Sequence, residues 1–220
     1  MPHLNYYRRI FSAYLLGGKS HLTFWHETPA ENPNASSTDL GEYYIDAPFI
    51  VGGGSDKAQA LAARVMPRFP TAAHRILALL AESNKDTATA ESEFRQAVNA
   101  RHSPEAWIDL AAFYQRQNRP GDALAAVRSA IAADRSRDAV LVDAASILTS
   151  AHRDPELAIR CLRDYLASPA KSDAAPAFKV HLQLSRLLAA QGDPAGANRE
   201  TEAAAALAPS FARSAAAHRS

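Results

Sequence analysis

The stretch Ser103–Ala130, SPEAWIDLAAFYQRQNRPGDALAAVRSA, decides the fold that this sequence predicts. Four of its residues recur at i, i+3, i+4 and i+7, the spacing that places side chains on one face of an α-helix: Trp107, Leu110, Ala111 and Tyr114. Ser103 suits the N-cap of that helix, and Pro104 suits its first turn. This half of the stretch therefore predicts an amphipathic helix over Pro104–Arg116.

A second helix follows at once. Asn118–Asp122, NRPGD, contains residues that favour a turn between antiparallel helices. Ala123, Val127 and Ala130 then return at helical spacing. Because alanine lets two helix backbones approach closely, we expect the two helices to pack as a hairpin, with the large aromatic residues filling the space beside the contact.

The same pattern recurs along the chain. Five segments share a turn followed by a small residue, a larger one four positions later, and another small or apolar one; their reference alanines are Ala58, Ala90, Ala123, Ala158 and Ala197. Successive alanines are 32, 33, 35 and 39 residues apart, close to the period of about 34 that marks helix–turn–helix repeats. A helix-length amphipathic run precedes each alanine. A longer loop, Ser168–Ala177, accounts for the last spacing.

These residues resemble the tetratricopeptide repeat (TPR) family over about residues 55–210. The full signature is Trp107, Ala111, Tyr114, Ala123, Val127 and Ala130, and weaker copies comprise Ala90, Phe94 and Ala97, then Ala158 and Leu162, then Ala197, Ala204 and Pro209. Pro70, like Pro209, sits where the family often ends a repeat. The resemblance implies an all-α protein, an α-solenoid of about four to five stacked antiparallel helix hairpins, and a non-enzymatic scaffold that binds a peptide or helix of a partner protein in its concave groove.

The sequence divides into an aromatic-rich, partly irregular leader (1–50), the repeat domain (51–210) and a tail (211–220). Within the leader, Thr28–Thr38 predicts a polar, turn-rich loop. Tyr6–Ile10, Leu22–His26 and Gly41–Tyr44 resemble the opening of bacterial proteins similar to D-glucuronyl C-5 epimerases. The resemblance ends near Asp46, so no catalytic residue can be transferred.

The leader therefore leaves two alternatives open. In one, the chain is an accessory or remnant of a protein that modifies glucuronate polysaccharides, and Trp25, Tyr43 and Tyr44 contact carbohydrate. In the other, the leader is a fusion scar without a role.

Charge, hydropathy and cysteine content indicate which partners and which cellular location to expect. The net charge is +1, so no strong field attracts nucleic acid or a membrane surface. No apolar run reaches the roughly 18 residues of a spanning helix. The single cysteine, Cys161, excludes an internal disulfide and favours a cytoplasmic location. Arg8-Arg9 before a short apolar run leaves export by an N-terminal signal as the alternative.

The glycine stretch before the first repeat, Gly52–Lys57, superficially resembles a phosphate loop. A P-loop needs GxxxxGK followed by Ser or Thr, and a dinucleotide loop needs a third glycine where Lys57 stands. Asp56 would also repel phosphate. We therefore expect a structural turn, with Ser55 as a helix cap and Asp56 favouring the helix N-terminus. Gly17–Ser20 lacks the first glycine of a P-loop, and no cofactor is expected.

No catalytic or metal site emerges from the sequence. His26-Glu27 lacks the second histidine of a zinc-protease motif. Four histidines of the repeats have no His or Cys partner at ligand spacing, and we expect them at the surface or at helix ends: His74, His102, His152 and His181. Cys161 fits a small packing residue better than a nucleophile.

The remaining expectation concerns the concave groove, which the first helix of each pair lines. The predicted groove residues are Ile108, Ala112, Gln115, Arg116, Asp143, Gln183 and Arg186. Members of the family that bind a C-terminal carboxylate use Lys and Asn in this groove. Ile108 and Ala112 occupy the matching positions, which disfavours that binding mode.

Overall fold

The computed structural model describes residues 33–172 and 175–208, and within them every regular element is helical. The elements are α3 (Pro33–Asp46), the short 3₁₀ helix η1 (Phe49–Val51), α4 (Ser55–Val65), α5 (Pro70–Ser83), α6 (Thr87–Arg101), α7 (Pro104–Arg116), α8 (Pro120–Ala133), α9 (Ala139–Ser150), α10 (Pro155–Ala167), α11 (Ala177–Ala190) and α12 (Pro194–Leu207). The all-α prediction is confirmed.

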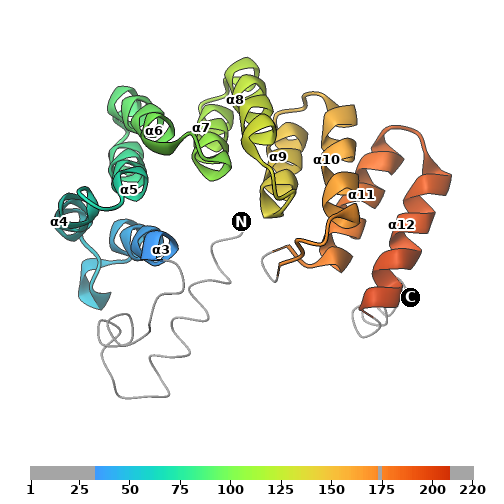
Figure 1. Cartoon of the computed structure of the whole chain (residues 1–220), viewed down its shortest axis with the longest axis horizontal. Helices are drawn as coiled ribbons and strands as arrows, with labels where there is room; N and C mark the ends of the chain where they lie inside the picture. Colours follow the sequence, from blue (N-terminus) through green and yellow to red (C-terminus); the bar gives the residue numbers. More distant parts are fainter. Residues whose placement is uncertain (1–32, 173–174, 209–220) are drawn as a thin grey trace.

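The helices pair into five antiparallel hairpins: α3–α4, α5–α6, α7–α8, α9–α10 and α11–α12. The second helix of each hairpin packs against the first helix of the next, and the hairpins follow one another along an arc (Figure 1). The structure is therefore a solenoid of the predicted kind.

The reference alanines all lie on the second helices, and all are buried. Ala58, Ala90, Ala123 and Ala158 are 0% exposed, and Ala197 is 7% exposed. A buried alanine at each equivalent position shows that the predicted register is correct, because only a small side chain fits where two backbones approach this closely.

The central hairpin forms as its sequence predicts. The Ser103 hydroxyl accepts a hydrogen bond from the Ala106 amide at 3.3 Å and caps α7, and Pro104 lies in the first turn. Leu110, Ala111 and Tyr114 are buried, while Trp107 is half-buried. The connecting turn is shorter than expected, because α8 begins at Pro120 within the NRPGD segment.

The expected loop at Thr28–Thr38 is wrong from Pro33 onward, since α3 begins there and forms the first helix of the first hairpin. Leu40, Tyr44 and Ile45 of α3 pack with the buried side chains of α4 and α5. Gly41 is buried, and a Cβ on it would lie 2.5 Å from Ile76 Cγ1. Close packing against α5 therefore overrides the weak helix propensity of the Ser- and Thr-rich start. Residues 28–32 lie outside the described part.

The three glycines form the turn that connects α3 to α4. The Gly54 amide donates a hydrogen bond to the Tyr44 carbonyl at 2.8 Å, and Lys57 Nζ donates one to the Gly52 carbonyl at 2.9 Å. A Cβ on Gly53 would lie 1.7 Å from the Ala47 carbonyl oxygen. Asp56 lies in the first turn of α4 as expected, but the N-cap is Gly54 and not Ser55. The stretch is a structural turn.

Among the described residues, no helix is both long and apolar enough to cross a membrane.

Gly53→Ala tests the close approach in this turn. We expect it to lower the free energy of unfolding by about 2–4 kcal/mol, because the added methyl group forces two backbone segments apart. Gly121→Ala is the matched control: its Cβ would meet nothing within 4 Å in the first turn of α8, so it should be neutral or stabilising by up to about 1 kcal/mol. Chemical denaturation measures both, and equal effects would contradict this account of the turn.

Candidate functional site

The first helices of the hairpins form the inner surface of the arc. The first helices of the first four hairpins touch one another, α3 with α5, α5 with α7, and α7 with α9, whereas any contact between second helices in the described part of the chain is weaker. Adjacent helices approach most closely on the inside of a curved stack, so α3, α5, α7 and α9 line its concave face (Figure 1).

A hollow of about 410 Å³ lies on this face between α3, α5 and α7. Its wall combines apolar and charged side chains. The residues that line it are Glu42, Ile45, Asp46, Arg75, Leu79, Glu82, Ser83, Phe94, Asp109, Ala112 and Arg116. We call this hollow the concave groove. Three of its residues come from α3, which the sequence analysis assigned to the leader.

Arg75 of α5 connects three inner helices across the groove. Its Nη2 atom lies 2.6 Å from Glu42 Oε1 of α3, and its Nε atom donates to Asp109 Oδ2 of α7 at 2.8 Å. The side chain is only 23% exposed. Burial disfavours its charge, but Asp109 and Glu42 outweigh burial and raise the Arg75 pKa, so the guanidinium remains protonated.

Arg116, a predicted groove residue, is also held by an ion pair. Its Nε and Nη2 atoms donate to the two carboxylate oxygens of Glu82 on α5, at 2.8 and 2.7 Å. This bidentate geometry fixes the guanidinium plane. Arg116 therefore lines the groove, as does Ala112, but its charge is already compensated.

The other predicted groove residues are distributed along the inner helices. Ile108 is half-buried and packs against the main core, and Gln115 is half-buried on α7. Gln183 of α11 donates a hydrogen bond to Ser146 Oγ of α9 at 3.0 Å, and Arg186 is exposed on α11. None of these four lines the hollow. Their role in binding stays a prediction.

Asp143, the predicted groove residue of α9, lies in an acidic environment. Although the Asp143 residue keeps exposed surface, partial burial of its carboxyl group together with the negative charges of Asp109 and Asp138 raises its pKa to about 6. Burial and Glu42 likewise raise the Asp39 pKa on α3, although Arg75 opposes the shift. The concave face therefore carries negative charge that its own arginines do not neutralise.

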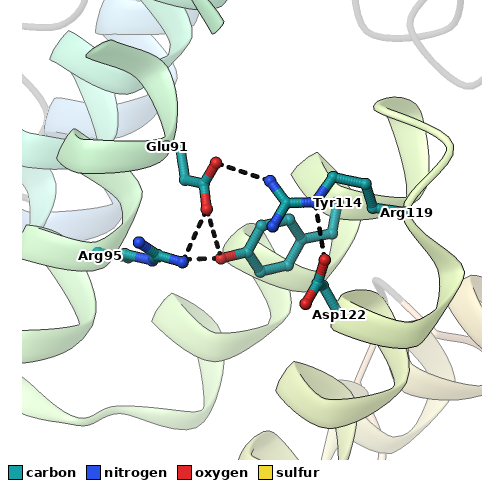
Figure 2. Close-up of polar contacts among 5 residues, drawn as sticks. All are labelled: Glu91, Arg95, Tyr114, Arg119 and Asp122. Atoms are coloured by element: carbon teal, nitrogen blue, oxygen red, sulfur yellow. Dashed lines mark hydrogen bonds and ion pairs between the residues drawn. The ribbon is translucent and has the colours of Figure 1, made fainter. Parts of the chain in front are cut away.

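A second polar network joins the hairpins α5–α6 and α7–α8 (Figure 2). Glu91 of α6 accepts from the Tyr114 hydroxyl at 3.0 Å and pairs with Arg119 at 2.7 Å, while Arg119 also reaches Asp122 at 2.7 Å. Arg95 donates to the Tyr114 hydroxyl at 3.3 Å. Every polar group drawn has a partner within the chain, so the network is structural.

The sequence analysis missed two hydrogen bonds between a histidine and a glutamate. His74 Nδ1 lies 2.7 Å from Glu93 Oε2, and His181 Nδ1 lies 2.6 Å from Glu200 Oε2; each pair joins the two helices of one hairpin. In each pair the histidine precedes its glutamate by 19 residues. This shared spacing between the two helices of a hairpin could have revealed the pairs from the sequence. His102 and His152 lie exposed at helix ends, as expected.

Two further findings bear on chemistry. No group of three or more His, Cys, Asp or Glu side chains in the described residues could hold a metal ion. Cys161 is buried at 2% exposure, and burial raises its pKa to about 11, which keeps the thiol protonated. This agrees with a packing role.

Removing the Arg75 side chain should destabilise the folded protein at the groove. We expect Arg75→Ala to cost about 2–4 kcal/mol of stability, because it leaves the Glu42 and Asp109 carboxylates close together without a cation. The triple variant Arg75→Met, Glu42→Gln, Asp109→Asn should recover most of this loss. Arg64→Ala, exposed on α4, is the control and should be neutral. Thermal unfolding compares the stability of these three variants with that of the wild type. An Arg75→Ala variant as stable as the wild type would contradict a stabilising role for the Arg75 ion pairs.

The raised Asp143 pKa predicts a pH dependence. Between pH 3.8 and about 6 the folded state retains a proton that the unfolded state releases, so stability falls as pH rises through this window. Asp143→Asn should therefore stabilise the protein near neutral pH, by no more than about 1 kcal/mol because solvent screens the exposed side chain. The gain should vanish in acid. Urea unfolding of wild type, Asp143→Asn and the exposed control Glu202→Gln across this range measures the effect; a pH-independent difference would contradict it.

Solved structures show where else this architecture occurs. BtubC (BKLC) from P. vanneervenii aligns with a TM-score of 0.60 and 17% identity, over 93% of this chain and 91% of its own. A putative kinesin light chain with TPR-like repeats from Podosopora anserina aligns with a TM-score of 0.55 and 18% identity, over 80% and 96%. YrrB, a TPR protein with an unusual peptide-binding site, aligns with a TM-score of 0.54 and 11% identity, over 84% and 91%.

No protein-family model matches the chain, and no curated protein is similar to it in sequence. The resemblance of residues 1–46 to an epimerase leader thus has no support, and its last segment, Gly41–Tyr44, lies on a repeat helix. Because these sequence identities are 18% or lower, the structural alignments establish the fold alone. The chain has the fold of tetratricopeptide repeat proteins.

Proposed function

We propose that this protein is a non-enzymatic interaction module that binds a peptide or helix of another protein in its concave groove. The observation that carries the proposal is the groove itself. It lies on the inner face of the solenoid and combines apolar surface from Ile45, Leu79 and Ala112 with charged side chains from the first helices of three successive hairpins. Such a mixture suits an amphipathic segment, which can bury one face and pair its charges at the rim.

The likeness to YrrB supports this proposal, because that TPR protein of the same fold has a peptide-binding site. The acidic environment of Asp143 and Asp39 supports a protein ligand over nucleic acid, since phosphates would be repelled from this face. A cytoplasmic location, with export as the alternative, stays a prediction.

Site-specific photo-cross-linking in cells tests the proposal. A photoreactive amino acid is placed at Ala112 in the groove, or at Ala125 on α8, which is exposed outside it. We expect a discrete set of protein adducts from position 112, with the cross-linked residues of each partner falling in one short segment.

The control position 125 should give few adducts or different ones. Groove adducts should also disappear when Leu79→Glu places a further charge on the apolar wall, provided that circular dichroism shows the variant folded. Identical adducts from both positions would contradict binding in the groove.

A further inference from the structure

Acidic residues predominate in the first helices of the first four hairpins. These inner helices, α3, α5, α7 and α9, carry seven acidic residues and two arginines, whereas the fifth, α11, carries Lys179, Arg186 and no acidic residue, and the second helices of the five hairpins carry eight acidic and eight basic residues. The whole chain has a net charge of only +1. The negative charge is thus concentrated on the concave face of the first four hairpins.

Both arginines of these four helices are already engaged. Arg75 pairs with Glu42 and Asp109, and Arg116 pairs with Glu82. No basic side chain of the described residues forms an ion pair with Asp39, Asp46 or Asp143. Of these, Asp46 lines the groove, whose carboxylates outnumber its two arginines. This excess of negative charge beside apolar surface favours an occupant that is both cationic and apolar.

One segment of the same chain has this chemistry. Residues 5–26, NYYRRIFSAYLLGGKSHLTFWH, contain Arg8, Arg9 and Lys19 and no acidic residue, and the first carboxylate of the chain is Glu27. The basic residues are interleaved with aromatic and aliphatic ones. Since this segment holds three Lys and Arg residues and no acidic residue, its charge is opposite to that of the concave face.

The connection to the array is long enough. Residues 27–32 separate the basic segment from Pro33, the first residue of α3, and six extended residues span about 20 Å. Glu42 lies nine residues into α3, about 14 Å along its axis. A segment tethered in this way experiences an effective concentration of about millimolar, so even modest affinity keeps it bound.

We propose that the concave groove binds the basic aromatic segment 5–26 of its own chain, so that an external ligand must displace an intramolecular one. The inference rests on the proposed function, because it assigns an occupant to the same groove. Residues 5–26 would then regulate the interaction module by occupying its groove. Binding of a partner would then depend on how well the partner competes with this segment.

Paramagnetic relaxation in the full-length chain tests the proposal. A nitroxide is attached at Ala13→Cys in a Cys161→Ala background, and amide signals of the inner and outer helices are compared. We expect strong broadening around Glu42–Asp46, Leu79–Ser83 and Asp109–Arg116, and little on the outer face of α8. The broadening should decrease at about 1 M salt, where the Debye length falls to about 3 Å.

Charge variants make the test specific. Arg8→Glu with Arg9→Glu should abolish the groove broadening, whereas the matched reversal Arg213→Glu with Arg219→Glu, in the C-terminal tail, should leave it intact. Broadening that is absent, spread over both faces or insensitive to Arg8 and Arg9 would overturn the proposal. Broadening in a mixture of isotope-labelled chain with unlabelled spin-labelled chain would show that a second copy supplies the segment, and would overturn the intramolecular assignment.

The experiments distinguish failure of the intramolecular ligand from failure of the external partner. Photo-cross-linking from position 112 is repeated in the full-length Arg8→Glu, Arg9→Glu chain, and we expect several-fold more partner adducts than in wild type. Unchanged adducts together with absent broadening would reject the intramolecular ligand and retain the groove. Absent adducts in both chains, with intact broadening, would reject the external ligand alone.

Discussion

The concave groove depends on the Arg75 guanidinium, which joins α3, α5 and α7 through Glu42 and Asp109. A charge this far from solvent is favourable only with partners on both sides, so the three helices are held in one relative position. Gly41 permits the same arrangement sterically, because any side chain there would collide with Ile76. The ion pairs of Arg75 and the close packing at Gly41 thus both position α3 on the inner wall.

This arrangement makes part of the N-terminal region a component of the repeat array. α3 is the first helix of the first hairpin, and it supplies Glu42, Ile45 and Asp46 to the groove. The binding surface proposed here therefore begins before the residues that show the repeat pattern most clearly. The excess of carboxylates on the inner helices then gives that surface a definite electrostatic character, although the whole chain is almost neutral.

The architecture was predictable from the sequence because small residues recur where backbones must approach, as at Ala90, Ala123 and Ala158. The first helix of the first hairpin was assigned to the leader, since Ser and Thr dominate the start of α3 and the longer connection through Gly52–Gly54 conceals its relation to the repeat. Leu40, Gly41 and Tyr44 nevertheless have the spacing of Leu110, Ala111 and Tyr114. The groove could be predicted only in part: Ala112 and Arg116 line the hollow, but pairings such as Arg116 with Glu82 depend on tertiary contacts 34 residues apart.

Amide hydrogen exchange of α3 in the full-length protein tests the central claim most directly, namely that this helix completes the groove. The structure predicts protection of the α3 amides after Leu40 comparable to that of α5, since both pack into the same cluster of buried side chains. It also predicts that Arg75→Ala lowers protection in α3 while α11 and α12 remain unaffected. Exchange of α3 at the rate of an unfolded chain in the wild-type protein would contradict the account.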